Sequence, residues 1–266
     1  MWNRNPNVFW GGVLVIVGVL FLLANLNVLQ NVTWDLVWPV FLIALGVWLV
    51  AARIGPGGAS MDVDTSEPRD GMDRAKLEVV VGAGRLEVRA APLDEQLYRV
   101  HIDHGGATPE VRLDRGSGTL RISQRVEWFM GARRLHVDAR LTDAIPWEVI
   151  CTTGAIRADF DFSSAKLTGF GCRTGASTVD LALGAPKGIV PVRVDGGAVT
   201  VQITRPAGVA IQVQASGAAI QLRADGNPRQ DGLGSKMWKS EGFDAAADRY
   251  DVTISGGALN VTVTGR

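Results

Sequence analysis

The sequence is poor in the residues and motifs that mark most enzymes and nucleic-acid-binding proteins. Its 266 residues include two cysteines, too few for a disulfide framework or a four-ligand zinc site. Lys plus Arg number 27 and Asp plus Glu number 27, so no excess of positive charge favours nucleic acid. The chain has no P-loop, H-E-x-x-H motif or nucleophile elbow. The composition therefore predicts a non-enzymatic protein with no nucleic-acid partner.

One glycine-rich stretch, residues 79–89 (VVVGAGRLEVR), begins like the strand and turn of a dinucleotide-binding domain. That motif, G-x-G-x-x-G/A, needs a third small residue so that a helix can pack on the strand, and Glu87 stands there instead. Leu86 and Val88 alternate with charged residues, which is the period of a strand. The stretch therefore predicts a bend between strands and no bound cofactor or small-molecule substrate.

Charged residues are absent from two long apolar runs near the N-terminus. The first run, residues 8–24, lies in a charge-free stretch from 5 to 33, longer than the ~20 residues needed to span a bilayer. The second, residues 36–52, approaches the same length. A cleaved signal peptide is the alternative for the first run, but no A-x-A site follows it. We expect a transmembrane helical hairpin over residues 1–53, with the lipid bilayer as a partner.

The few basic residues beside this hairpin predict its orientation. Arg4 precedes the first run, Arg53 follows the second, and the loop between the runs has no Lys or Arg. The positive-inside rule then places both ends of the hairpin in the cytoplasm. We expect a multi-pass protein of the bacterial inner membrane whose remaining chain faces the cytoplasm.

Residues 54–73 lack apolar periodicity and are rich in Gly, Pro and acidic residues. This composition is typical of a flexible linker. It predicts a tether between the hairpin and a separate domain over residues 74–266.

Within that domain, pairs of small residues recur at a fixed period. Gly154, Gly175, Gly196 and Gly217 each begin a Gly-Ala or Gly-Gly pair, and they follow one another at intervals of 21 residues. A further pair begins at Gly256, after a longer interval, as if one repeat carried an insertion. Equal spacing of this kind indicates a repeat architecture.

Each period contains two pieces in which apolar and polar residues alternate, such as 178–183 and 189–194, separated by Gly and Pro. The β-branched content favours strands. We therefore predict a mainly β structure, a β-solenoid of 21-residue coils stacked about 4.8 Å apart. The small pairs, Gly82 and Gly84 included, would form corners that need positive φ or close approach of the backbone. An antiparallel sandwich of hairpins is the alternative.

The two cysteines have the same 21-residue spacing as the corner glycines. Cys151 and Cys172 are 21 residues apart, each three residues before a corner glycine. In stacked coils their α-carbons would come within the ~4.4–6.8 Å that a disulfide requires. In the cytoplasm they would stay reduced. We interpret them as structural thiols, with a redox role as the alternative.

The histidines lie near aspartates and suggest a metal site as one hypothesis. His101, Asp103 and His104 form HIDH, and His136 with Asp138 forms HVD. On a strand, His101 and Asp103 share a face whereas His104 points to the other side. A three-ligand geometry is not evident from this spacing. We interpret these residues as exposed polar positions on strands, and we predict no catalytic, cofactor-binding or metal-binding residue in the chain.

The insertion, residues 227–249, has two features of its own. Residues 225–232 (DGNPRQDG) are faintly similar to a calcium loop but lack the Glu at the twelfth place, so a surface turn is expected. Trp238, Phe243 and Tyr250 are predicted to cover the open end of the stack, because solenoid ends need capping. A partner-binding patch is the alternative for these aromatic residues.

The chain resembles a known family in two regions. GGVLVIVGVLFLLANL followed by WDLVWPVFLIALGVWLV is similar to the LiaI/LiaF-type membrane region. GAGRLEV, TGAIRADFDFSSAKLTGFGCRTGASTVDLALG, RPAGVAIQV and WKSEGFDAAADRYDVTISGGALNVTV resemble the LiaF C-terminal and toastrack domains. The resemblance implies a role in sensing or modulating the cell-envelope stress response, by restraint of a membrane histidine kinase. The chain departs from that pattern because its hairpin is shorter than the family's membrane region.

Three functions remain open at this point. The first is a non-enzymatic, membrane-anchored regulator or scaffold that binds another membrane protein, for which the resemblance suggests a histidine kinase. The second is a structural role, in which the coils of neighbouring copies pair end to end into a filament through unpaired strand edges. An enzyme is the third and least favoured alternative.

Overall fold

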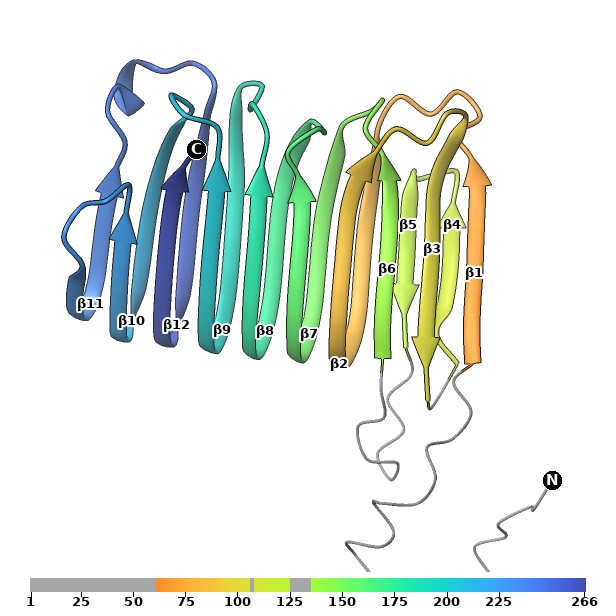
Figure 1. The fold of residues 1–266 in the computed structure, drawn as a ribbon, viewed down its shortest axis with the longest axis horizontal. Helices are drawn as coiled ribbons and strands as arrows, with labels where there is room; N and C mark the ends of the chain where they lie inside the picture. Colours follow the sequence, from red (N-terminus) through yellow and green to blue (C-terminus); the bar gives the residue numbers. More distant parts are fainter. Residues whose placement is uncertain (1–60, 106–107, 125–134) are drawn as a thin grey trace, which may run out of the picture. The chain divides into compact units, whose positions relative to one another are not determined.

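Alternating apolar and polar residues form twelve strands in the computed structural model, which describes residues 61–105, 108–124 and 135–266 (Figure 1). A 3-10 turn, η1 (Phe243–Ala245), separates the last two strands. The strands are β1 (Met61–Pro68), β2 (Ala75–Ala91), β3 (Gln96–His104), β4 (Glu110–Asp114), β5 (Thr119–Ser123), β6 (Leu135–Thr142), β7 (Trp147–Phe162), β8 (Leu167–Leu183), β9 (Ile189–Arg205), β10 (Ala210–Ala224), β11 (Gln230–Lys239) and β12 (Arg249–Gly265).

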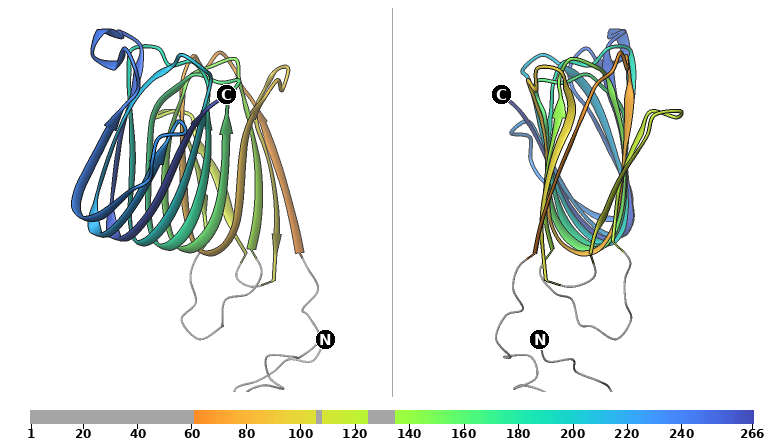
Figure 2. Two further views of the ribbon diagram at one scale, coloured as in Figure 1. Left: turned by 60° about the vertical axis from the view of Figure 1, so that its left-hand side comes forward. Right: turned by 90° about the vertical axis from the view of Figure 1, so that its right-hand side faces the viewer.

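The six longest strands each bend at their middle, so that the two halves of one strand face each other (Figure 2). The halves before the bends form one layer, called here the first arm, and the halves after the bends form the second arm. The path through neighbouring strands is β1-β3-β6-β2-β7-β8-β9-β12-β10-β11. β5 pairs with the first half of β2 and carries β4, whereas β6 pairs with the second half of β2. Short strands therefore extend both arms at the N-terminal end of the domain.

The hydrophobic core fills the space between the two arms. Every second residue of a long strand points inward, as the burial of Leu77, Val79, Leu86 and Val88 along β2 shows. Burying one such side chain fully stabilises the fold by about 1.5–3 kcal/mol. The alternation seen in the sequence thus specifies both arms and the core between them.

The corner glycines are required by close packing of the backbone. A Cβ added at Gly154, Gly175 or Gly256 would lie 2.4–2.7 Å from the carbonyl oxygen of the glycine in the adjacent coil. Real Cβ atoms do not approach an oxygen so closely, because van der Waals repulsion rises steeply. Among these corners only Gly84 has a positive φ, of 150°. Of the two reasons expected for small residues here, close approach is the general one.

The predicted β-solenoid is confirmed, with two differences in its coils. β2, β7, β8 and β9 stack in parallel and in register, which is the arrangement of a solenoid and not of the alternative antiparallel sandwich. The first difference is that the two alternating pieces around each corner, which the sequence predicts as separate strands, join into one continuous bent strand. They join because the small corner residues let the backbone ladder continue through the bend.

The second difference concerns the last repeat. Its strand, β12, does not follow β10 at the end of the stack but lies between β9 and β10 (Figure 1). β10 instead pairs on its other side with β11, in antiparallel orientation. The interpretation of residues 227–249 as an insertion within a simple stack is therefore incomplete, since the strand that follows it returns to an earlier place.

The expected flexible linker, residues 54–73, is wrong for one part. Residues 61–68 form β1, which pairs antiparallel with β3 from Met61 opposite His104 onward. Val63 and Thr65 are partly shielded, and Val63 packs against the core, so sheet pairing overrides the polar composition. Within the part of the chain described above, no helix is long and apolar enough to span a membrane. The predicted hairpin, 1–53, lies outside the described residues.

Candidate interaction surface

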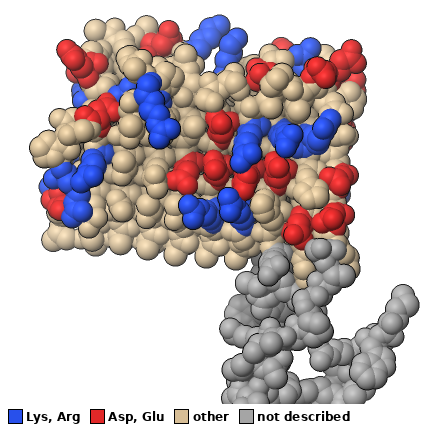
Figure 3. All heavy atoms as spheres, viewed as in Figure 1, with Lys and Arg blue, Asp and Glu red and all other residues tan. Residues whose placement is uncertain are grey.

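The outward side chains of the second arm line up in rows, because adjacent strands pair in register. One row holds a carboxylate on each of four neighbouring strands: Asp138 of β6, Glu87 of β2, Asp159 of β7 and Asp180 of β8. These four residues are called the acidic row. Figure 3 shows the resulting band of acidic side chains across the face of the domain. Beyond Asp138 the same row continues with His101 of β3.

Arginines stand one outward position away from the acidic row, on both sides along β2 and on one side along β6 and β7, but not along β8. Arg85 and Arg157 stand side by side on the side nearer the corners. Arg99, Arg140 and Arg89 form a second row on the other side. Basic side chains accordingly lie above and below the acidic band in Figure 3. The face is therefore strongly patterned in charge.

Glu87 is the member of the acidic row that is fully neutralised. Its Oε1 lies 2.7 Å from Arg85 Nε and its Oε2 lies 2.7 Å from Arg89 Nη2. His136 Nε2 is a more distant neighbour, at 3.6 Å. The two guanidinium groups lie so close to the carboxylate that Glu87 is only 8% exposed. A buried carboxylate needs such partners, since an unpaired one would be strongly destabilising.

The other carboxylates of the row are less well satisfied. The Oδ1 atoms of Asp138 and Asp180 are buried and accept no hydrogen bond within the described part of the chain. Burial, followed by repulsion from Asp159, raises the pKa of Asp180 above its usual value, although Arg157 opposes the shift. Like charges directly opposite one another in a sheet are destabilising. The acidic row is therefore a line of like charges that are only partly offset by hydrogen bonds and arginines.

The histidine and aspartate candidates lie on β3 and β6, and the structure brings most of them onto this face. His101 Nδ1 lies 2.8 Å from Asp64 Oδ1, and this hydrogen bond raises the pKa of His101. Asp103 lies opposite His136 in the β3–β6 ladder. His104 points to the side opposite His101, as its place in the alternation predicts, but it is buried there, so the interpretation as an exposed polar position is wrong for this residue. Among residues 61–105, 108–124 and 135–266, no three such side chains form a group that could hold a metal.

The two cysteines are direct neighbours, as their spacing predicts. Cys151 and Cys172 are paired across the β7–β8 ladder, and both are free and buried. A hydrogen bond that the Cys151 thiol donates to Cys172, and then burial, raise the pKa of Cys151 above its usual value. A thiol with a raised pKa is a poor nucleophile. This environment fits structural thiols.

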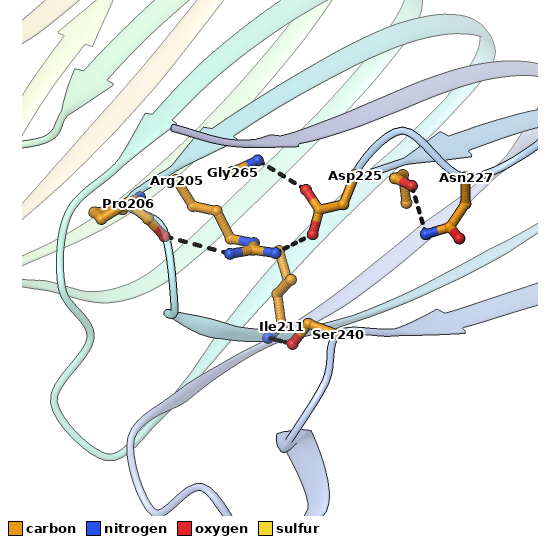
Figure 4. A network of polar contacts seen from close by, with 8 residues as sticks. Arg205, Pro206, Ile211, Asp225, Asn227, Ser240 and Gly265 are labelled. Carbon is orange, nitrogen blue, oxygen red and sulfur yellow. Dashed lines mark hydrogen bonds and ion pairs between the residues drawn. The ribbon is translucent and has the colours of Figure 1, made fainter.

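Asp225 is the first residue of the segment that is faintly similar to a calcium loop, residues 225–232, and its carboxylate is bound by protein groups. Asp225 Oδ2 accepts a hydrogen bond from Arg205 Nη2, and Asp225 Oδ1 accepts one from Gly265 N at 2.8 Å (Figure 4). Arg205 is at the end of β9 and nearly fully buried. The Asp225 carboxylate is thus engaged by protein groups that join three strands.

The three aromatic residues predicted to cap the open end have different places. Trp238 lies on the terminal strand β11 and is partly buried against the core. Phe243 lies in η1 between Lys239 and Arg249, with cation-to-ring distances of 5.3 and 5.1 Å. Tyr250 is not a cap. It is fully buried inside the domain on β12, and its hydroxyl donates to the Gly184 carbonyl at 3.0 Å.

Sequence reasoning missed the acidic row, although a signal for it exists. Glu87, Asp159 and Asp180 each follow a corner glycine, namely Gly82, Gly154 and Gly175, by five residues. If the repeats are aligned at their corner glycines, the three carboxylates occupy equivalent positions, which predicts that they lie in one row across neighbouring strands. Asp138 carries no such signal, because β6 has no corner.

Comparisons with known proteins agree with this architecture. The family described as the N-terminal domain of toast_rack, DUF2154, matches residues 56–204, which is more than half of the chain. The chain belongs to this family. The LiaI-LiaF-like transmembrane region matches residues 8–50 and indicates association with a membrane. No curated protein matches the chain.

Solved structures similar to this chain include a putative cell adhesion protein from Clostridium sporogenes. It is 20% identical, with a TM-score of 0.67, over 78% of this chain and 100% of that one. Putative adhesins from Bacteroides fragilis and Parabacteroides merdae cover 78% of this chain at 7% and 10% identity, each with a TM-score of 0.22. At this identity the first similarity shows the fold alone. The two family matches, taken by themselves, fit a membrane-associated protein.

Proposed function

We propose that this toast-rack protein is a non-enzymatic, membrane-anchored regulator or scaffold of the bacterial cell-envelope stress response. The observation that carries the proposal is the acidic row, a set of aligned carboxylates on the outer face of the second arm. Two of its buried oxygens accept no hydrogen bond from the described residues. A partner that presents Lys or Arg side chains would offset the repulsion between the aligned carboxylates of the row. Such charge complementarity fixes the orientation of a complex and speeds its formation.

The proposed partner is another membrane protein, and a histidine kinase is the candidate that the family resemblance favours. A membrane segment at residues 8–50 would hold the charged face near such a partner and raise its effective concentration. We further propose that the segment is a multi-pass hairpin with the β-domain on its cytoplasmic side. Cysteine labelling at Arg266 in intact cells tests this orientation, and labelling from outside the cell would contradict it.

The contact is tested by reversing charge on the acidic row in the full chain. We expect Asp159→Lys with Asp180→Lys to abolish regulation of a cell-envelope stress reporter, because the variant face repels a cationic partner. A matched control, Glu148→Lys with Asp251→Lys, reverses two exposed carboxylates on the first arm. Both variants must reach wild-type levels in the membrane. Unchanged regulation by the acidic-row variant, or equal loss in the control, would rule out this face as the contact.

Self-assembly through strand edges is a second candidate, supported by the position of exposed apolar residues. Met61 lies on β1, and Leu233 and Met237 lie on β11, the strands at the two ends of the sheet path. Lys236, Lys239 and positive-φ glycines also lie on β11, and such features discourage edge pairing. Cross-linking in native membranes that recovers only copies of the chain itself would favour this candidate over the regulator.

A further inference from the structure

The position of β12 is unusual because it does not follow chain order. β7, β8 and β9 stack one after another, but β12 separates β9 from β10. It pairs in parallel with both, from Arg249 opposite Ile189 and Ala210 to Val263 opposite Ile203 and Ala224. The space between β9 and β10 is called here the β12 slot. A strand made after β10 has to enter the slot between two strands made before it.

The strands on either side of the slot are built to pair with each other. Their corner glycines, Gly196 and Gly217, are 21 residues apart, the spacing that puts β8 directly beside β7. Their connector, residues 206–209, has four residues, as does the 163–166 connector from β7 to β8. Between β7 and β8, a connector of this length joins directly adjacent strands, which lie about 4.8 Å apart. Between β9 and β10, the connector has to cross twice that distance, because β12 lies between the two strands.

The inward side chains of β9 and β10 also match at this offset. Every inward apolar residue of β9 has a buried apolar residue at the equivalent position of β10. The matching pairs are Val190 and Ile211, Val192 and Val213, Val194 and Ala215, Val199 and Ile220, Val201 and Leu222, and Ile203 and Ala224. The domain can therefore close when β12 leaves, with β10 against β9 and the core still covered.

A polar clamp holds β12 in the slot from above. Arg205, at the end of β9, reaches over Gly265 of β12 to Asp225, just after β10 (Figure 4). A Cβ at Gly265 would lie only 3.3 Å from Arg205 Nη1, so glycine gives the guanidinium room to pass. The clamp joins β9 to β10, and its contact with the occupant is the backbone N–H of Gly265. It accepts a strand that ends in this geometry with glycine at this position.

We propose that the β12 slot is a strand-exchange site, occupied in a dimer by β12 of a second copy of this chain. A released β12 is a 17-residue strand whose inward face includes Tyr250, Val252, Ile254, Leu259, Val261 and Val263, all of which must be shielded from water. The β12 slot of a second copy offers this strand the same pairing register, the same corner glycines and the same Arg205–Asp225 clamp. Exchange of an identical element keeps every contact and is a low-cost route to a dimer.

Two features of the chain favour this exchange. Closure of β10 on β9 keeps the core covered while β12 is out, so the domain need not unfold for β12 to leave. The connector before β12, residues 240–248, carries η1 and is the segment that would cross to the second copy. Copies that share a membrane are also concentrated near one another, which favours dimers.

Disulfide trapping between two copies of the full chain tests the proposal. Gln202 of β9 and Thr262 of β12 are ladder partners on the outer face of the second arm. Two differently tagged chains, one with Gln202→Cys and one with Thr262→Cys, are produced together in membranes and oxidised. In a strand-exchanged dimer the two new thiols are adjacent, so we expect an intermolecular disulfide.

A control pair of cysteine positions distinguishes strand exchange from disulfides that form by random collision of two copies. Thr178 of β8 and Thr200 of β9 are ladder partners on the same face, but neither strand is exchanged in the proposed dimer. We expect the 202/262 pair to give about tenfold or more intermolecular disulfide than the 178/200 pair, since adjacency raises the effective concentration of the thiols. The double variant Gln202→Cys with Thr262→Cys in one chain verifies that the bond forms when the strands are neighbours. If it forms there while the mixed copies give no disulfide, or no more than the 178/200 pair, the proposal is overturned.

Discussion

The outer face of the second arm has two regions that share one backbone and differ in their side chains. Toward β2, β7 and β8 it carries the acidic row and its arginines. Toward β9 and β12 the equivalent positions hold Thr200, Gln202, Asn260 and Thr262, none of which is charged. Both regions keep the same register, corner glycines and apolar interior. The inward positions and corners therefore determine the fold, and the outward positions are free to determine what the face binds.

The largest expected effect on stability comes from substitutions at the corner glycines, which the charged and uncharged regions share. We expect Gly175→Ala and Gly256→Ala each to lower the free energy of unfolding by about 1–3 kcal/mol, because overpacking forces the backbone to shift. The added Cβ atoms would lie 2.7 Å and 2.4 Å from the carbonyl oxygens of Gly154 and Gly196. Denaturant unfolding of the full chain, followed by circular dichroism, measures both.

Gly171 is the control for this change. It lies on β8 near the Gly175 corner, and a Cβ there would meet nothing within 4 Å. We expect Gly171→Ala to leave the denaturant concentration at the unfolding midpoint nearly unchanged or to raise it slightly, because alanine restricts the conformations of the unfolded chain. Equal destabilisation by Gly171→Ala and Gly175→Ala would show that loss of glycine itself, and not close approach at the corner, is responsible.

These corners also show how far the sequence alone leads. The regular spacing of the corner glycines and the alternation around each corner predict the parallel coils, the inward residues and the neighbouring cysteines, because each depends on local spacing. The place of β12 could not be predicted. Gly256 and Gly257 fit beside the Gly196 and Gly217 corners alike, so the repeat pattern does not specify the order of the coils.

The candidate site was predictable only in part, for a related reason. His101, Asp103 and Asp138 stand out as local patterns, yet what surrounds them comes from strands far apart in the chain. Asp64, the partner of His101, lies in a segment whose composition predicts a flexible linker. The acidic row exists only once β6, β2, β7 and β8 are side by side. Pairing between distant strands is the information that local periodicity lacks.

A smaller effect sharpens the contrast between the two regions by removing charge from the acidic row. Glu87→Gln should lower the free energy of unfolding by about 1 kcal/mol, since it leaves Arg85 and Arg89 without their shared carboxylate and both arginines are half exposed. High salt should reduce this difference, because it screens the original ion pairs. Gln202→Ala, at the equivalent position in the uncharged region, should show no such salt dependence. Thermal unfolding at low and high salt compares the two variants.

The smallest effect concerns Asp180, where the charged region meets the uncharged one. Because its pKa is raised in the folded state, the folded domain binds this proton more tightly than the unfolded chain does. Its contribution to stability is therefore full at low pH and is lost as pH rises through the folded pKa. Asp180→Asn should remove that loss and stabilise the domain near neutral pH by less than about 1 kcal/mol. The difference should shrink as the wild-type carboxyl becomes protonated.

Thermal unfolding of Asp180→Asn and wild type between acidic and neutral pH measures this difference. Asp251→Asn, on the exposed side of the first arm, is the matched control for removing one negative charge. A stabilisation of Asp180→Asn that is constant across the pH range would mean that the amide gains a contact of its own. A stabilisation that grows toward neutral pH would show that this end of the acidic row holds its charge at a cost, which a cationic partner would relieve.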